Sequence, residues 1–171
     1  MSAINLLIET KRLTIRSLTE ADVPVIASIW ADAQVTRFLG GPRDFETVCN
    51  SLKDDLTVPP ARLDLWPVVE RSSGNVVGHC GLLPKTVDER DEVELTYVLA
   101  ANCWGKGYAT EAAAAVRDYG FRTLAIMRLV ALIDIAHIAS ERVALKLGMK
   151  FEANTMRPSG KTMRVYAMAA S

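Results

Sequence analysis

The stretch NCWGKGYATEAAAAV, residues 102–116, places two glycines one residue apart directly before a run of strong helix formers. A strand is expected to end at Leu99 and a helix to begin near Ala109, so unpaired helix amides converge on the turn between them. A helix N-terminus carries about half a positive charge, and glycine lets an anion approach the backbone closely. The stretch is therefore typical of a phosphate-binding turn. The alternative is that Gly107 only ends a loop and the alanines only pack.

Two other phosphate motifs do not fit this turn. A P-loop has Ser or Thr after its Gly-Lys pair, whereas Lys106 is followed by Gly107, with no second glycine at the required distance upstream. The dinucleotide fingerprint requires a third glycine where Thr110 stands. Neither motif is expected here.

Length, composition and charge limit the class of protein. The 171 residues are 50% apolar, which suits one domain with a substantial core, expected over residues 1–171. Lys plus Arg and Asp plus Glu number 20 each, so no basic field attracts nucleic acid or an anionic membrane. No apolar run approaches the length of a membrane span, and the start does not resemble a signal peptide. Three widely spaced cysteines suggest reduced thiols, and we expect a cytoplasmic protein.

Apolar periodicity predicts an alternation of strands and helices. We expect strands at 13–18, 66–70, 76–83, 92–99, 128–133, 150–154 and 162–168, and helices from Thr19 or Asp22 to Trp30 and at 45–56, 109–124 and 140–147. The strands between 66 and 99 should form an antiparallel meander. The helix between 99 and 128 should be a right-handed crossover to a parallel strand. The order predicts one α/β domain of mixed α+β type.

The sequence resembles the GNAT superfamily of acetyl-CoA-dependent N-acetyltransferases over nearly its whole length. The resemblance rests on ELTYVLAANCWGKGYATEAAAAVRDYGF (94–121) and MRLVALIDIAHIASERVALKLGMKFEA (127–153), with ETKRLTIRSLTEAD (9–22) and LWPVVERSSGNVVGHCGL (65–82) matching the first strand and central hairpin. The most similar branch is the ribosomal-protein N-terminal acetyltransferases. That branch reads Glu-x-Gly-Tyr-x-Leu, Trp-Gly-x-Gly-Tyr-Ala-Thr-Glu-Ala, Asn-x-x-Ser and Lys-Leu-Gly-Phe in this order.

The resemblance implies a twisted mixed sheet of about seven strands, with helices on both faces and a V-shaped split between the central strands. In this family the pantetheine arm of acetyl-CoA lies in the split and bonds to the backbone of the first split strand, here Tyr97 to Leu99. The pyrophosphate lies on the amides of the glycine turn. The residues implied for acetyl-CoA binding are Tyr97, Val98, Leu99, Trp104, Gly105, Lys106, Gly107, Tyr108, Ala109 and Thr110.

The resemblance also implies catalytic residues. A lysine-like amine, with a pKa of about 10.4, must lose a proton before it attacks a thioester. Glu94 matches a position where some members hold a carboxylate base, and Glu92 on the same strand face is expected to raise its pKa. The alternative is that both are solvated strand carboxylates. The family implies a backbone amide near the middle of this strand for the oxyanion, here that of Val98, and Ser140 for the departing thiolate, although Ser140 also suits a helix cap.

Two positions depart from the branch motifs: Thr96 stands where the branch has glycine, and the second departure concerns the cofactor. His137 stands where the family has the asparagine that holds the pantetheine or thioester end, and an imidazole reaches differently and can titrate. His137 is therefore included among the expected cofactor-binding residues. Cys103 has no histidine partner nearby in sequence, so a covalent acetyl-cysteine route is disfavoured. With no spaced Cys, His and carboxylate cluster, no metal site is expected.

The leading hypothesis is therefore an N-acetyltransferase that moves an acetyl group from acetyl-CoA to a primary amine in a ternary complex. The acceptor is either a protein N-terminus or a small-molecule amine, and a homodimer is left open. One alternative is a non-catalytic acyl-CoA-binding regulatory module, which would bind acetyl-CoA without transfer. Another is a nucleotide-phosphate binder, which would prefer ATP or NAD to coenzyme A.

Overall fold

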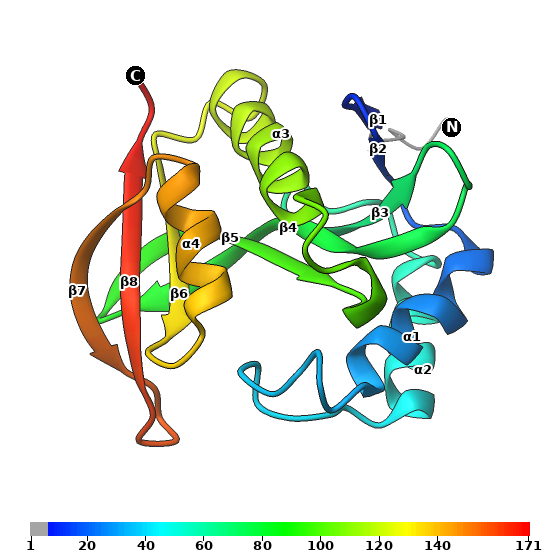
Figure 1. The fold of residues 1–171 in the computed structure, drawn as a ribbon, viewed down its shortest axis with the longest axis horizontal. Coiled ribbons are helices and arrows are strands. Elements are labelled where there is room, and N and C mark those ends of the chain that lie inside the picture. The colour runs from blue at the N-terminus through cyan, green and yellow to red at the C-terminus, as the bar shows by residue number, and fades with distance from the viewer. Residues whose placement is uncertain (1–6) are drawn as a thin grey trace.

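The alternating strands expected from the sequence assemble into one mixed sheet in the order β1-β2-β3-β4-β5-β6-β8-β7 (Figure 1). The computed structural model describes residues 7–171. Its strands are β1 (Leu7–Glu9), β2 (Leu13–Arg16), β3 (Leu65–Glu70), β4 (Val76–Val87), β5 (Arg90–Leu99), β6 (Arg128–Asp134), β7 (Lys150–Met156) and β8 (Thr162–Ala169). Its helices are α1 (Val23–Ala31), α2 (Phe45–Asp55), α3 (Tyr108–Arg122) and α4 (Ile138–Lys146).

The sheet has eight strands rather than the expected seven. The additional strand is β1, which is three residues long and pairs with β2 through Ile8 and Ile15. A strand this short shows no alternation that sequence analysis can detect. β4 and β5 are longer than expected because Asp88 and Glu89 form a tight turn with φ of +46° and +64°, so pairing continues to Val87 and Arg90.

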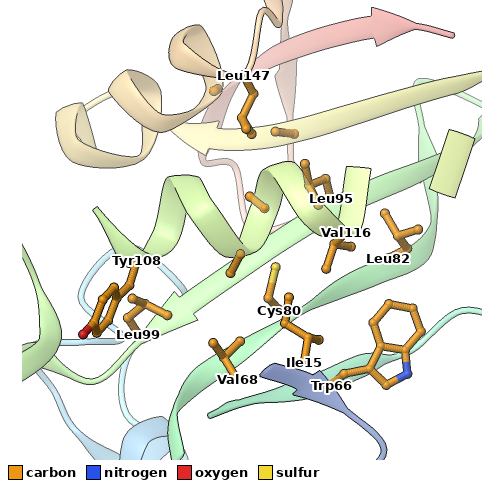
Figure 2. Close-up of a cluster of buried hydrophobic side chains, with 14 of the residues drawn as sticks. Ile15, Trp66, Val68, Cys80, Leu82, Leu95, Leu99, Tyr108, Val116 and Leu147 are labelled. Carbon is orange, nitrogen blue, oxygen red and sulfur yellow. The ribbon is translucent and has the colours of Figure 1, made fainter. Parts of the chain in front are cut away.

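Helices cover both faces of the sheet, as expected (Figure 1). α3 packs on the face that includes Leu95 and Leu99, and Figure 2 shows Val116 of this helix among the buried side chains. α1 packs on the opposite face against Val98. Because successive side chains of a strand point to opposite faces, β5 contributes to both cores. Each fully buried aliphatic side chain here stabilises the fold by roughly 1.5–3 kcal/mol.

β5 and β6 form the V-shaped split that the family resemblance implies. β5 pairs with β4 along its whole length, from Arg90 to Leu99, but with β6 only at Glu94 and Val130. Beyond this point the two strands diverge (Figure 1). The backbone of residues 95–99 therefore has no strand partner on the β6 side, which leaves its amides on that side for a ligand, whereas the Leu99 carbonyl is bonded within the chain.

α4 begins earlier than expected. Ser140 was considered as its cap, but the helix starts at Ile138 and His137 occupies the N-cap position. The Asp134 carboxylate accepts a hydrogen bond from the Ala136 N–H at 2.8 Å, which starts the turn ahead of the helix. Ser140 thus lies in the first turn of α4, and its expected role as a cap is wrong. In residues 7–171, no helix is both long and apolar enough to cross a bilayer.

Candidate active site

The glycine turn has the backbone conformation that its sequence predicted. Gly105 and Gly107 have φ of +76° and +81°, in the left-handed region that side chains disfavour. Gly107 is the N-cap of α3, so the amides of the first helical turn follow it directly. A Cβ on Gly105 would meet no atom within 4 Å, so this position needs glycine for its conformation rather than for space.

A cavity of about 560 Å³ lies between the glycine turn, the free edge of β5, the start of α4 and the α1–α2 connection. The structure brings most of the expected site residues to its lining. These are Tyr97, Val98, Leu99, Trp104, Gly105, Gly107, Tyr108, Ala109, Thr110, His137 and Ser140. Lys106 and Glu94 do not line this cavity. A volume of this size is in the range of pockets that hold cofactor-sized ligands.

The free edge of β5 exposes specific backbone groups. Ala100 N–H donates to the Val77 carbonyl of β4 at 2.9 Å, and hydrogen-bonded pairs alternate along an antiparallel ladder. The Val98 N–H is therefore turned toward β4, whereas those of Tyr97 and Leu99 face the split. This corrects the expected oxyanion donor, because the Val98 amide does not face the cavity. The Leu99 carbonyl accepts a bond from the Trp104 indole at 3.0 Å.

Glu94 lies at the vertex of the split, where β5 and β6 pair. Its side chain is almost buried, and its carboxylate lies 3.7 Å from Lys85 Nζ. Burial raises the pKa of Glu94, while Lys85 and Arg157 act in the opposite direction. The expected influence of Glu92 is wrong, because Arg128 binds the Glu92 carboxylate at 3.0 Å and burial accounts for the shift.

Tyr97 and Ser140 meet across the split. The Tyr97 hydroxyl donates to the Ser140 carbonyl at 2.9 Å, and Ser140 Oγ donates to the Tyr97 hydroxyl at 3.2 Å. Burial raises the pKa of Tyr97 to about 12, so the phenol stays protonated at neutral pH. Sequence analysis expected only the backbone of Tyr97 to act. Its hydroxyl was missed, although a tyrosine on the strand that borders the split was the available signal.

His137 and Phe38 form an aromatic pair at the cavity. Their rings are stacked with centroids 4.6 Å apart and an angle of 24°, and Phe38 comes from the α1–α2 connection. Burial lowers the pKa of His137, opposed by the nearby Asp134 carboxylate. The residue that replaces the family asparagine thus packs as a largely neutral ring against the opposite wall of the cavity.

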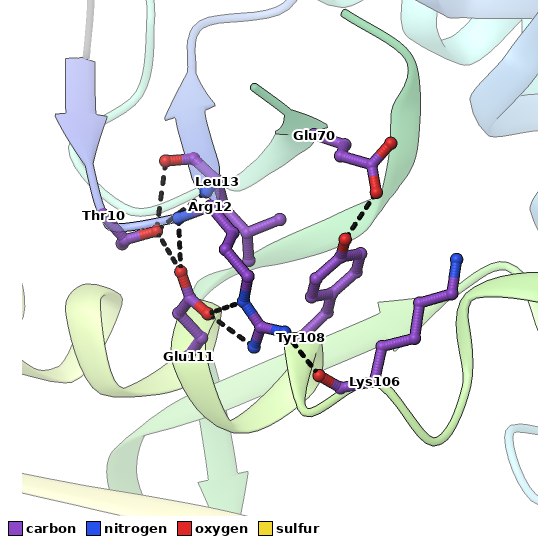
Figure 3. A network of polar contacts seen from close by, with 7 residues as sticks. All are labelled: Thr10, Arg12, Leu13, Glu70, Lys106, Tyr108 and Glu111. Carbon is purple, nitrogen blue, oxygen red and sulfur yellow. Dashed lines mark hydrogen bonds and ion pairs between the residues drawn. The ribbon is translucent and has the colours of Figure 1, made fainter. Parts of the chain in front are cut away.

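A polar network holds the glycine turn from behind (Figure 3). The Glu111 carboxylate of α3 accepts bonds from Thr10 Oγ1 at 2.7 Å, Arg12 N–H at 2.8 Å and Arg12 Nε at 2.7 Å. Arg12 in turn donates to the Lys106 carbonyl at 2.8 Å. The Lys106 Nζ lies 5.8 Å from the centroid of the Tyr108 ring. Sequence analysis did not find Arg12 or Glu111, because they are distant in the chain.

The three cysteines are unbridged and buried, as expected for reduced thiols. Cys103 lines the cavity, but burial raises the pKa of its thiol, the opposite of what a nucleophilic thiolate requires. Glu70 raises it as well, while Lys106 opposes the shift. A thiol with a raised pKa disfavours a covalent acetyl-cysteine route.

Comparisons with known proteins agree with this geometry. A family model described as an acetyltransferase (GNAT) domain matches residues 12–150. The Bacillus subtilis protein YkkB is 38% identical over 104 residues, which are 61% of this chain and 60% of that protein. The N-acetyltransferase p20 of Bacillus licheniformis is 27% identical over 169 residues, which cover 92% of this chain and 91% of that one.

Solved structures share the fold along almost the whole chain. An acetyltransferase of the GNAT family from Bacillus anthracis has a TM-score of 0.83 at 26% identity, covering 96% of this chain and 99% of that one. The ribosomal-protein-S5-alanine acetyltransferase of Vibrio fischeri has a TM-score of 0.76 at 15% identity, with 97% of each chain covered. The comparison with the Vibrio fischeri structure shows that the two chains share a fold.

Proposed function

Because the chain belongs to the GNAT acetyltransferase family, we propose that it transfers the acetyl group of acetyl-CoA to a primary amine within a ternary complex. One observation carries this proposal: the free edge of β5 and the glycine turn open into the same cavity. A ligand with an extended amide-containing arm and a pyrophosphate fits these two features together.

The cavity offers a separate group for each part of acetyl-CoA. We propose that the pyrophosphate lies on the amides from Gly105 to Thr110, where the helix N-terminus favours an anion. The pantetheine arm then runs along β5, as an added strand would, and bonds to the Leu99 N–H. The thioester lies farther toward the vertex of the split, so its oxygen is placed near the Tyr97 N–H.

The same arrangement supplies the chemical steps. The amine attacks the thioester carbon, a C–N bond forms, and Glu94 takes the proton that the amine loses, through a water molecule. The Tyr97 N–H donates to the oxyanion of the tetrahedral intermediate. When the intermediate collapses, the C–S bond breaks and the CoA thiolate leaves. The Tyr97 hydroxyl, which accepts from Ser140 Oγ, turns its one proton from the Ser140 carbonyl to that thiolate and donates to it until solvent protonates the sulfur.

A matched pair of glycine variants tests the binding site. Gly105→Ala and Gly160→Ala both place a Cβ at positive φ, +76° and +81°, in open space, and Gly160 lies in the β7–β8 turn away from the cavity lining. We expect both to cost similar stability, about 1 kcal/mol. Only Gly105→Ala should weaken CoA binding in isothermal titration calorimetry, by about tenfold or more. Equal affinities for the two variants would contradict the proposed pyrophosphate site.

Transfer itself is tested with an amine panel. Amine-dependent release of CoA thiol, with the acetylated amine identified by mass spectrometry, is the expected result. The panel should include peptides with free N-termini and small-molecule amines. Tight CoA binding without transfer to any amine would favour the acyl-CoA-binding module instead. If the protein binds ATP or NAD more tightly than CoA, both the acetyltransferase and the acyl-CoA-binding module are contradicted.

A further inference from the structure

The turn between β7 and β8 carries an arginine whose backbone is fixed by the turn itself. Arg157 directly follows β7, and its N–H donates to the Lys161 carbonyl at 2.9 Å. The Gly160 N–H donates to the Arg157 carbonyl at 2.8 Å, and these two bonds close the turn. Figure 1 shows the turn extending past the end of β6. The position from which the Arg157 side chain leaves is therefore well defined.

Strand register places Arg157 on the face of the sheet that carries the Glu94 side chain. Glu94 pairs with Val130 of β6, and Asp134 lies four residues farther along that strand, on the same face. Asp134 and Thr155 both lie opposite the same residue of β8. Arg157 comes two residues after Thr155, and its bond to the opposite strand continues the ladder. Its side chain therefore leaves on the face of Glu94.

Arg157 has no anionic partner among residues 7–171. Its Nε is shielded from solvent and has no hydrogen-bond partner there, and no carboxylate in these residues forms an ion pair with it. Asp88, at the tip of the β4–β5 hairpin, accepts instead from Thr155 Oγ1 at 2.8 Å. Burial raises the pKa of Glu94, and the charges of Lys85 and then Arg157 oppose this shift. The guanidinium thus lies near the Glu94 carboxylate without pairing with it.

The neighbouring charges cancel, so that of Arg157 is left uncompensated. Lys85 Nζ lies 3.7 Å from the Glu94 carboxylate, and Lys161 forms an ion pair with the nearly buried Asp134. An acceptor that carries only an amine arrives as a second cation, which the Arg157 charge repels. An acceptor with a carboxylate next to its amine avoids this repulsion and gives the guanidinium a partner. The charges beside Glu94 therefore favour an acceptor that carries its own carboxylate.

Building on the acetyl transfer proposed above, on which this inference rests, we propose that the acceptor is a free α-amino acid. Its amine lies beside Glu94, and its carboxylate accepts two bonds from the Arg157 guanidinium. The two groups of an α-amino acid share one carbon, which suits a carboxylate and a guanidinium that lie close together but do not pair. The amine nitrogen forms the C–N bond as its proton passes to Glu94, the C–S bond breaks, and solvent protonates the CoA thiolate. The products are an N-acetylamino acid and CoA.

L-Leucine is the probe. Leu83 of β4 pairs with Glu94, Leu132 of β6 lies on the same face, and both are partly exposed, which suits an apolar side chain. Leucinamide replaces the carboxylate with a neutral amide, and 3-methylbutylamine lacks it altogether. The amine of leucinamide is less basic than that of leucine, because a neighbouring carboxylate stabilises the ammonium form. Amine reactivity alone would therefore favour leucinamide.

Amine-dependent release of CoA at pH 7.5 should give a kcat/KM about tenfold or more higher for leucine than for either matched compound. Mass spectrometry should identify N-acetylleucine as the product. Equal values would overturn the proposal while leaving acetyl transfer itself intact. The same holds for a preference for leucinamide, which resembles the N-terminus of a peptide.

Binding separates this proposal from acetyl transfer itself. Isothermal titration calorimetry of the full chain saturated with CoA should show leucine binding about tenfold or more tighter than 3-methylbutylamine, with or without turnover. This preference without transfer to any amine would contradict acetyl transfer but support the carboxylate site. Equal binding of the two compounds would contradict the carboxylate site.

Variants assign the carboxylate to Arg157. Arg157→Gln should lower the ratio of kcat/KM for leucine to that for leucinamide about tenfold. The ratio is the readout because loss of the Arg157 charge also acts on Glu94 and so slows both substrates. Arg157→Lys should restore part of the ratio, and Arg122→Gln, which removes an exposed guanidinium in the last turn of α3, should leave it unchanged. An unchanged ratio in Arg157→Gln would contradict the site.

Discussion

Glu94 shows how one buried carboxylate differs from its neighbours on the same strand. Glu92 is ion-paired with Arg128, whereas Glu94 is buried beside Lys85 at a longer distance, and burial raises its pKa. A raised pKa brings a carboxylate closer to the range in which a general base works well. It also means that the ionised form is disfavoured in the folded state. Protonated Glu94 stabilises the folded state fully when the pH is below the pKa that Glu94 has in the unfolded chain. This stabilisation is lost as the pH rises through the pKa of Glu94 in the folded protein.

Glu94→Gln should therefore reduce activity without reducing stability. We expect kcat/KM to fall by about 100-fold. The fall of kcat/KM at low pH, which protonation of a carboxylate with a raised pKa causes, should disappear from the pH profile. The melting temperature at pH 7.5 should stay equal or rise, because an uncharged amide replaces a buried charge. Rate profiles from pH 5 to 9 and thermal melts measure both effects.

Glu92→Gln is the matched control for this experiment. It removes a carboxylate two residues away on the same strand, and it should lower stability because Arg128 loses an ion-pair partner. Its kcat/KM profile should keep the acid limb. A Glu94→Gln enzyme with the rate and pH profile of the unmodified protein would exclude Glu94 as the base.

Tyr97→Phe tests the proposal that the Tyr97 hydroxyl donates a hydrogen bond to the departing thiolate. We expect kcat to fall by about tenfold or more, with little change in the KM for acetyl-CoA, because the hydroxyl acts on the transition state. Tyr119→Phe on α3 is the control, since the Tyr119 ring contacts Trp66 edge to face and lies outside the cavity lining. Steady-state kinetics of both variants decide the point. Equal kcat values would remove the Tyr97 hydroxyl from the mechanism.

At the level of single elements, the start of α3 depends on a strand far away in the chain. Glu111 lies in the first turn of α3 and binds Thr10 and Arg12, and Arg12 holds the Lys106 carbonyl (Figure 3). The carboxylate near the helix N-terminus also suits the helix dipole. The glycine turn before α3 is thus held in place by contacts to the β1–β2 connection.

Glu111→Gln should loosen this turn. Burial raises the pKa of Glu111, but bonds from Thr10 and Arg12 outweigh it and hold the pKa below its usual value. The ionised Glu111 carboxylate therefore stabilises the fold when the pH is above the pKa that Glu111 has in the unfolded chain. This stabilisation is lost as the pH falls through the pKa of Glu111 in the folded protein. We expect the free energy of unfolding at pH 7 to fall by about 1–2 kcal/mol, and CoA affinity to fall with it. Urea denaturation at pH 7 and pH 3.5 should show a smaller difference between the two proteins at the lower pH.

Glu46→Gln is a suitable comparison, since Glu46 lies in the first turn of α2 and is exposed. It also removes an acidic group near a helix N-terminus, but that helix does not border the cavity proposed to bind acetyl-CoA. CoA affinity should be unchanged in this variant. If the Glu111→Gln protein is as stable as the Glu46→Gln protein, the bonds of Glu111 to Thr10 and Arg12 do not stabilise the fold as expected.

In the molecule as a whole, β5 and β6 join two parts of the sheet through a single paired position, and the ligand is expected to lie in the gap. A ligand that bonds to β5 and contacts α4 connects the two parts. CoA at 100 times its Kd should stabilise the folded state by about 2.7 kcal/mol. For a chain of this size the melting temperature should then rise by about 5–10 °C.

Differential scanning fluorimetry with CoA measures this shift, and hydrogen exchange locates it. Protection should increase at residues 95–99 and 105–110, and Gly105→Ala should reduce both effects. Protection confined to the region of α2 would contradict the proposed CoA site at β5 and the glycine turn.

The fold was largely predictable from local pattern. Alternation and helical periodicity placed seven of the eight strands and all four helices near their observed bounds, because each signal depends on neighbours in the chain. The start of α4 was misplaced because Asp134 begins the turn before Ser140. The Val98 N–H does not face the cavity as expected, because its direction depends on its pairing with β4, which periodicity does not show.

The sequence by itself determined the order of the elements, the glycine turn before α3 and the strand that borders the split, since these follow from residue conformation and periodicity. The tertiary structure decided which side chains meet: Tyr97 with Ser140, Arg12 with Glu111, and His79 with Trp30. These pairs are 43, 99 and 49 residues apart. Their contacts, and the burial that raises the pKa of Glu94, depend on strand register and on how helices pack across the sheet.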